Sequence, residues 1–295
     1  MGAPKCATTA LAEYLCAHSA VFMPPKELHF FGRDLNFGPR FFRRDLQSYM
    51  SEYAGWNGQS SGGEASVLYL FSTRAAREIH EFNPQARIII VLRDPVEVIY
   101  SLYHQFRFDA NEHLPTFEEA LEAEEDRRLG RRISRSTYFV QGLVYRDVVH
   151  YTEQVRRYFL AFGRDQVRVV IFDDFSADVQ KEYRATLEFL GLDPNGGPKE
   201  FRVINGNQSV RSRVLRAVLC EPLTRSLCVR ASRALGRGVF VAVRNVEAKL
   251  WKLNSRPLPR PPMSAELRGR LKQEFAPEVE KLSELLQRDL THWSR

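Results

Sequence analysis

An apolar run that leads straight into a capped helix constrains the fold of this chain more than any other feature. Residues 86–92 read ARIIIVL, a β-branched stretch typical of buried strands in parallel sheets. Asp94 then provides a suitable N-cap, and Pro95 stands at the first helical position of RDPVEVIYSLYHQF. A second such run, VRVVIF at 167–172, precedes a helix ending at FLGLDP. This alternation predicts an α/β fold with a central, mostly parallel sheet flanked by helices.

The remaining pattern supplies further elements. We expect helices at 9–18, 73–84, 116–128 and 138–162, a strand at 65–71, a linker at 256–262 and a last helix at 264–290. We expect the 295 residues to form a single domain, with a nucleotide-binding core at 1–210 and a basic helical C-terminal part at 211–295. No apolar run approaches the roughly 18 residues of a membrane helix, and the first residues lack a signal-peptide pattern, so we expect a cytoplasmic protein.

The sequence GAPKCATT, here called the N-terminal turn (Gly2–Thr9), is a glycine-started turn that leads into a helix. Its backbone amides and the Thr8 and Thr9 hydroxyls can hold a phosphate at the positive end of the helix dipole, and Lys5 adds a full charge. The turn is not a Walker A loop, because GxxxxGK[ST] requires glycine and lysine where this chain has Ala7 and Thr8.

A buried strand normally delivers such a turn, yet only Met1 precedes it. A sheet without that strand leaves buried backbone groups on its neighbours unsatisfied. We therefore expect that the sequence is truncated and that the natural protein carries about 5 to 15 more residues that include a strand.

Arg93 and Ser101 are candidates for a second anion contact. Arg93 ends a buried strand, where a guanidinium needs a carboxylate or an anionic ligand, and Ser101 lies in the following helix. The alternatives are an ion pair of Arg93 with Asp94 or another acid and a tolerated polar residue at 101.

Positive charge is concentrated between Arg211 and Arg260, where twelve Lys or Arg face two acids. This basic segment favours an anionic partner, or else it is the solvated face of amphipathic helices. Within NGNQSVRSRVL, Arg211 and Arg213 either close over a nucleotide phosphate or lie solvated at a helix N-terminus. The four cysteines form no CxxC pair or metal-ligand spacing, so we expect no metal.

Four stretches together resemble the sulfotransferases that use 3′-phosphoadenosine 5′-phosphosulfate (PAPS), of the bacterial type related to the heparan sulfate sulfotransferases. These stretches are GAPKCATTAL, PPKELHFFG, RDPVEVIYSLYHQF and LLQRDLTHW, and they span residues 2–293. The resemblance implies a P-loop-like nucleotide-binding fold, PAPS as the sulfuryl donor and PAP as the product. In GEASVLY, Ala65 follows Glu64 where animal heparan 3-O-sulfating enzymes have lysine, so animal-type heparan recognition is not implied.

The resemblance also implies a role for each matched residue. The 5′-phosphosulfate would lie on the N-terminal turn and the 3′-phosphate on Arg93 and Ser101, with Glu27 as the catalytic base, Lys5 on the leaving group and His29 as helper. The implied nucleotide-binding residues are Gly2, Ala3, Lys5, Cys6, Ala7, Thr8, Thr9, Arg93 and Ser101, with Arg211 and Arg213 as further candidates.

Three functions remain open at this point. The first is a sulfotransferase acting on a hydroxyl or amine of a glycan, lipid or small molecule. For this function the acceptor can be anionic and the protein can contact a membrane peripherally, and we expect no binding of nucleic acid. The second is a nucleotide or sugar kinase, which the failed Walker A match disfavours. The third is a non-catalytic polyanion-binding protein, which the basic segment suggests.

Overall fold

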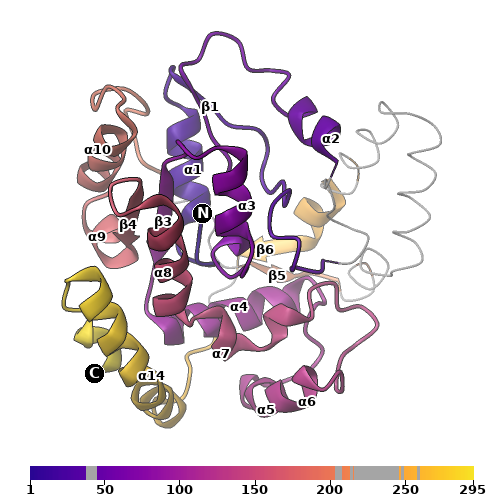
Figure 1. The fold of residues 1–295 in the computed structure, drawn as a ribbon. Helices are drawn as coiled ribbons and strands as arrows, with labels where there is room; N and C mark the ends of the chain where they lie inside the picture. Colours follow the sequence, from indigo (N-terminus) through magenta and orange to yellow (C-terminus); the bar gives the residue numbers. More distant parts are fainter. Residues whose placement is uncertain (38–44, 203–207, 213–214, 216–245, 247–248, 258–259) are drawn as a thin grey trace.

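The computed structural model describes residues 1–37, 45–202, 208–212, 215, 246, 249–257 and 260–295. Helices and strands alternate along the first two thirds of the chain (Figure 1). The elements in chain order are α1 (Thr8–Cys16), β1 (Val21–Phe22), α2 (Leu46–Ser51), β2 (Ser61–Gly62), the 3₁₀ turn η2 (Val67–Tyr69), α3 (Ala75–Phe82), β3 (Ile88–Leu92), α4 (Pro95–Phe108), α5 (Phe117–Glu122), α6 (Glu124–Arg128), η3 (Gln141–Leu143), α7 (Tyr145–Val148), α8 (Tyr151–Phe162), β4 (Val167–Ile171), α9 (Phe172–Ala177), α10 (Val179–Leu190), β5 (Gln208–Val210), β6 (Ser255–Pro257), α14 (Ala265–Leu286) and η4 (Thr291–Ser294).

The two buried strands expected from the apolar runs pair in parallel. Ile88 lies opposite Val167 and Leu92 opposite Ile171, so that β3 and β4 end at the same edge. The pair β1 and β2 is also parallel, whereas β5 and β6 are antiparallel. The fold is therefore the α/β architecture that the sequence predicts, with ligand-binding loops expected at the carboxyl ends of the strands.

The start of the chain lies along the other edge of β3. Gly2 forms a parallel bridge with Val91, the Ala3 N–H donates to the Val91 carbonyl at 2.8 Å, and the amino group of Met1 donates to the Ile89 carbonyl at 2.5 Å. A mainly apolar cavity of about 600 Å³ borders this edge, between β3, α1 and α3. A longer strand leading into Gly2 stays a prediction.

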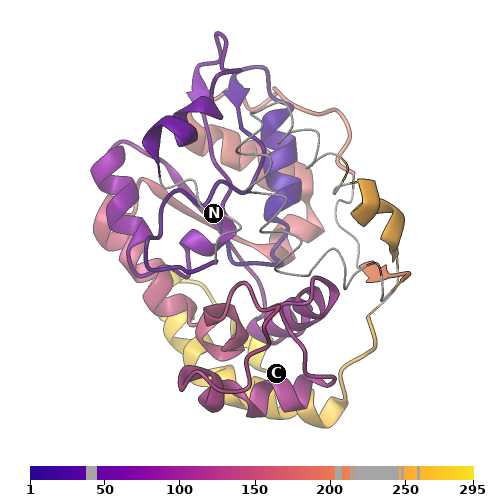
Figure 2. The same cartoon turned by 90° about the vertical axis from the view of Figure 1, so that its right-hand side faces the viewer.

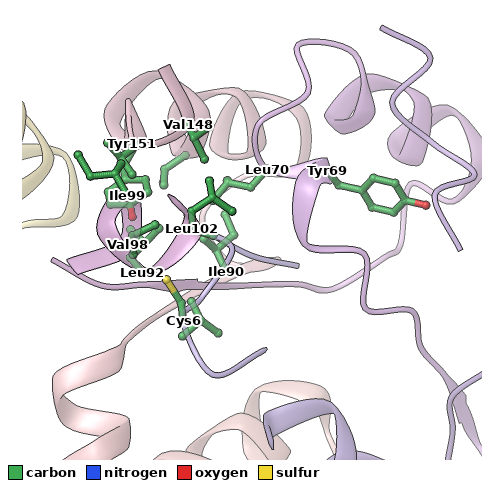
Figure 3. Packing of buried hydrophobic residues seen from close by; sticks show 14 of the residues in the cluster. Cys6, Tyr69, Leu70, Ile90, Leu92, Val98, Ile99, Leu102, Val148 and Tyr151 are labelled. Carbon is green, nitrogen blue, oxygen red and sulfur yellow. The ribbon is translucent and has the colours of Figure 1, made fainter. Parts of the chain in front are cut away.

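Helices cover the parallel pair and form the core with it. In Figure 1, α8 lies in front of β3 and β4 and α14 lies beside α8, and both views place α14 at the end of the molecule opposite β1 (Figures 1 and 2). Figure 3 shows the buried side chains of Ile90 and Leu92 packed among Cys6, Val98, Ile99, Leu102 and Tyr151. The base of the N-terminal turn and the first turns of α4 thus share one core with β3.

Local capping fixes the starts of two helices, one of them as predicted. The Asp94 carboxylate accepts the Val96 N–H at 2.8 Å at the start of α4, and Ser264 accepts the Leu267 N–H at 3.2 Å at the start of α14. An N-cap of this kind stabilises a helix by about 1 kcal/mol. The capped strand-to-helix junction at 92–95 is confirmed.

Two expected elements are wrong, and distant side chains explain both. Residues 65–71 contain the short 3₁₀ turn η2 instead of a strand, since the Val67 N–H donates to the Glu27 carboxylate at 3.3 Å and not to a neighbouring strand. The single helix expected at 138–162 is divided into η3, α7 and α8. Glu278 of α14 accepts the Thr152 N–H at 2.7 Å, and the Gln154 amide donates to the Val148 carbonyl, so that side chains terminate α7 and start α8.

Most of the basic segment lies outside the described residues, with most of the amphipathic helices expected there, but residues 249–254 are described and are helical. Among the residues that are described, no helix combines the length and the apolarity needed to span a bilayer.

Candidate active site

The N-terminal turn leaves the edge of β3 through a tight, partly left-handed backbone. Gly2 approaches η2 so closely that a Cβ there would lie 3.0 Å from the Val67 side chain and carbonyl, which explains the glycine. Lys5 and Ala7 have φ angles of 65° and 60°, a conformation that non-glycine residues rarely adopt. Strain of this kind persists where surrounding contacts hold it, and it concentrates at ligand sites.

The side chains of the turn are divided between core and surface. Cys6 is fully buried and its thiol donates to the Pro4 carbonyl at 3.4 Å, and the Ala3 amide is already used by β3. The Lys5 ammonium donates to the Gln105 amide oxygen of α4 at 3.2 Å. Lys5 therefore projects across the carboxyl end of β3 toward α4, where a sheet of this class binds its ligand.

Arg93, the candidate for a second anion contact, lies beside Lys5. Its guanidinium lies 4.4 Å from the centre of the Phe172 ring, and one of its nitrogens donates to the Lys5 carbonyl at 3.5 Å. A second nitrogen lies 3.8 Å from the Glu97 carboxylate. This pairing with Glu97, rather than with Asp94, is the ion pair that the sequence left open.

Arg260 joins the same group, and sequence reasoning missed it because RPLPRPP resembles a linker. The hydroxyl of Tyr100 donates to the Pro261 carbonyl at 2.8 Å and ties this segment to α4. One terminal nitrogen of Arg260 is buried and has no hydrogen-bond partner within the described part of the chain. The His104 Nε2 atom, on the same side of α4, is likewise buried and unpartnered among those residues.

The electrostatics of this cluster favour an anion. Burial lowers the pKa of Lys5, and the charges of Arg260 and Arg93 lower it further, against an opposing effect of Asp109. Burial and the charge of Arg93 also lower the pKa of Arg260. Cations that destabilise one another in this way gain most when a multiply charged anion binds between them.

Lys26 connects the N-terminal turn to the predicted base. Its ammonium donates to the Thr9 hydroxyl at 3.0 Å, and burial lowers its pKa. Sequence reasoning missed Lys26 as well, because its only signal is its place beside Glu27. The loop of residues 24–32, here called the Glu27 loop, is thereby held against the first turn of α1.

The carboxylate of Glu27 lies in a partly enclosed position, with 24% of its side chain exposed. It accepts the Val67 N–H at 3.3 Å and lies 3.3 Å from the His29 Nε2 atom. Burial raises the pKa of Glu27 to about 7, although the charge of Lys26 acts in the opposite direction. A carboxylate with a pKa near neutrality is suited to general-base catalysis.

The remaining predicted residues are placed as follows. Thr8 lines the cavity beside β3, and Ser101 is buried within α4. The exposed Arg211 follows β5 and its guanidinium donates to the Ser255 carbonyl at 3.2 Å, whereas Arg213 lies outside the described residues. Within the described ranges, no group of three or more His, Cys, Asp or Glu has the arrangement of a metal site.

Fold and site together define an α/β protein with a lysine-bearing turn at the carboxyl end of a parallel sheet and a carboxylate beside it. A family model described as "Sulfotransferase domain" matches residues 1–211, and the chain therefore belongs to the sulfotransferase family, a family of transferases. The resemblance stated from the sequence is confirmed.

Relatives and a solved structure agree with this assignment. The chain is 24% identical over 250 residues to carbohydrate sulfotransferase 15 of Mus musculus, covering 66% of this chain and 43% of that protein. It is 29% identical over 105 residues to heparan sulfate glucosamine 3-O-sulfotransferase 5 of Homo sapiens, covering 36% of this chain and 29% of that protein. The match thus spans less than half the length of either relative. A crystal structure of a sulfotransferase from Alicyclobacillus acidocaldarius has a TM-score of 0.71 and 28% identity, and covers 100% of this chain and 97% of that one.

Proposed function

We propose that this protein transfers a sulfuryl group from PAPS to a hydroxyl or amine of a carbohydrate acceptor. Lys5, Thr8 and Thr9 bind the 5′-phosphosulfate, and Arg93, Ser101 and Arg260 bind the 3′-phosphate. The unpartnered nitrogen of Arg260 supports the last assignment, since a buried guanidinium nitrogen without an acceptor is costly unless a ligand supplies one.

The proposed reaction is an in-line displacement at sulfur. The acceptor oxygen or nitrogen forms a bond to sulfur while the bond from sulfur to the bridging 5′-phosphate oxygen breaks. The acceptor proton passes to the Glu27 carboxylate, and the electron pair of the broken bond stays on PAP. Lys5 stabilises the negative charge that develops on the bridging oxygen. Electrostatic stabilisation of this kind is usually the largest single term in lowering an activation barrier.

The observation that carries the proposal is the hydrogen bond of 3.0 Å between Lys26 and Thr9. It joins the turn that would bind the donor to the residue adjacent to Glu27, a carboxylate whose pKa lies near 7. The turn that would bind the donor and the loop that carries Glu27 are thereby held side by side, which supports one shared site for donor and acceptor.

The acceptor class rests on the relatives. One is named a carbohydrate sulfotransferase and the other a heparan sulfate glucosamine 3-O-sulfotransferase, which supports a carbohydrate acceptor here. A carbohydrate presents several hydroxyls of similar chemistry, so the choice among them depends on orientation in front of Glu27.

The test uses PAPS carrying radiolabelled sulfate with a panel of oligosaccharides, amino sugars and phenols. We expect label in a carbohydrate and release of an equal amount of PAP without added metal. Consumption of ATP with magnesium would instead indicate a kinase. Binding of heparin that is steep in salt, without transfer of label, would indicate a polyanion-binding protein.

A further inference from the structure

Glu64 lies at the centre of a hydrogen-bond network beneath the Glu27 loop. Its Oε1 atom accepts the Ser66 hydroxyl at 2.5 Å and the Tyr69 hydroxyl at 2.6 Å, and its Oε2 atom accepts the Tyr49 hydroxyl at 3.0 Å. The carboxylate is only partly exposed, and burial raises its pKa while these three hydroxyl donors lower it. None of these contacts is made to Lys5, Arg93 or Arg260, the cations of the proposed anion site.

The two hydroxyls on Oε1 bind four consecutive amides of the Glu27 loop. The oxygen of Ser66 accepts the N–H groups of Leu28 and His29, each at 3.1 Å. The oxygen of Tyr69 accepts the N–H groups of Phe30 and Phe31 at 2.8 and 3.2 Å. These four amides are buried and belong to no helix or strand, so the hydroxyls satisfy backbone groups that would otherwise cost about 1–3 kcal/mol each.

The hydrogen-bonding capacity of a hydroxyl makes the Glu64 carboxylate essential to the binding of these four amides. A hydroxyl has one hydrogen and two lone pairs, so Ser66 and Tyr69 can each accept two N–H groups only if their own hydrogen points elsewhere. Glu64 receives both hydrogens on one oxygen atom. Figure 3 shows the Tyr69 ring extending away from the buried cluster, with its hydroxyl at the far end.

The backbone of the Glu27 loop includes an unfavourable conformation that needs support from outside the loop. His29 has a φ angle of 50°, a left-handed conformation that is unfavourable for a residue with a Cβ. Glu27 comes directly before the four bound amides, and η2 is in turn tied to α8 by the hydroxyl of Tyr158, which donates to the Tyr69 carbonyl at 2.7 Å. The position of Glu27 thus depends on a support that begins at Glu64.

We propose that Glu64 is a positioning residue for sulfuryl transfer: it orients the Ser66 and Tyr69 hydroxyls, which bind the backbone of residues 28–31 and fix Glu27 and His29 in front of the acceptor. The role in transfer rests on the function proposed above, whereas the hydrogen-bond network does not.

Two substitutions at position 64 separate shape from charge. Glu64→Gln keeps an amide oxygen for the Ser66 and Tyr69 hydroxyls, and its NH₂ group can donate to the Tyr49 oxygen, whose hydrogen then turns to Tyr53, 3.2 Å away. Glu64→Leu removes both acceptors. The matched control is Glu78→Leu, because the Glu78 carboxylate accepts the next two amides, those of Gly32 and Arg33, at 2.7 and 3.3 Å.

The first measurement is amide hydrogen exchange, which needs no activity. In Glu64→Leu we expect the amides of residues 28–31 to exchange at least about tenfold faster, while those of 32 and 33 stay protected. Glu78→Leu should give the reverse pattern, and Glu64→Gln should match the wild type. Unchanged exchange at 28–31 in Glu64→Leu would overturn the proposal.

The second measurement is transfer kinetics. Glu64→Leu should lower kcat by about 100-fold, as a displaced catalytic group does, with the Kd for PAP unchanged within about twofold. Glu64→Gln should retain most of kcat. The acidic limb of its pH–rate profile should move to lower pH, because the negative charge of Glu64 raises the pKa of Glu27 and this charge is removed. The other charged or titratable groups that face Glu27 are Lys26, the N-terminal amine and His29, and all three remain in the variant. Wild-type kcat in Glu64→Leu, or loss of kcat with normal exchange, would contradict the positioning role.

Two further variants keep the test decisive if Glu64→Leu does not fold. Ser66→Ala should expose the amides of 28 and 29 alone, and Tyr69→Phe those of 30 and 31 alone. Equal exchange in both variants would refute the network. If the wild-type protein transfers no sulfate, the proposed function fails, and the exchange pattern still decides whether Glu64 holds the loop.

Discussion

Substitution of Glu27 by glutamine should stabilise the fold in a way that depends on pH. Burial raises the pKa of Glu27 from 4.5 to about 7, so the folded protein holds this proton more tightly than the unfolded chain. The stability from the protonated carboxyl is therefore complete below pH 4.5 and is lost as the pH rises through 7. The difference in pKa corresponds to about 3 kcal/mol when the carboxylate is fully charged.

Glutamine keeps the shape of the side chain but has no charge to bury. We expect Glu27→Gln to raise the free energy of unfolding by about 1–3 kcal/mol at pH 8, and to change it little at pH 4.5. Urea denaturation at both pH values measures the difference. Glu122→Gln, which alters an exposed carboxylate of α5, is the control and should stay within about 0.5 kcal/mol of the wild type at either pH.

The same variant separates binding from chemistry. Calorimetry should show PAP bound to Glu27→Gln with nearly the wild-type affinity, while transfer of label is lost, because glutamine cannot take the acceptor proton. A stability difference that is equal at both pH values would refute the burial of a charged carboxylate. Retained transfer would refute its role as base and make His29 the next candidate.

Two further predictions concern the anion site and the core. Arg260→Met should weaken PAP binding by about tenfold in calorimetry, because it removes a charge-assisted contact. It should also raise the melting temperature slightly, because it removes a cation that Lys5 and Arg93 repel. Unchanged affinity for PAP would exclude Arg260 from the site. Ile90→Ala should lower the free energy of unfolding by about 2–5 kcal/mol, because Ile90 is fully buried in β3, and a loss below 1 kcal/mol in urea denaturation would contradict the core described above.

The elements that the sequence predicts correctly are those whose signals are local. The run IIIVL, the Asp94 cap and Pro95 lie within eight residues, so that periodicity and capping chemistry predict β3 and α4 without reference to the rest of the chain. The N-terminal turn was likewise identified from its own eight residues. Lys5 and Arg93 come together because the N-terminal segment runs parallel to β3, so that both residues leave the same edge of the sheet.

The elements that were missed depend on distant partners. Residues 65–71 have the composition of a strand, but the Val67 N–H donates to the distant carboxylate of Glu27. The side-chain hydroxyls of Ser66 and Tyr69 accept the amides of residues 28–31, which ties the segment to the Glu27 loop. The start of α8 depends on Glu278, which lies more than a hundred residues later. Arg260 stands in a proline-rich segment that the contact of Tyr100 with the distant Pro261 ties to α4.

The most direct test of sulfuryl transfer is a single-turnover measurement with PAPS that carries radiolabelled sulfate, made on the wild type and on Lys5→Ala. We predict that label appears on the acceptor in the wild type in the same amount as PAP, and that Lys5→Ala slows this step by about 100-fold, the effect of removing one transition-state donor, with a smaller loss of PAP binding. Transfer at the same rate in both proteins, or PAP released without label on an acceptor, would contradict the account.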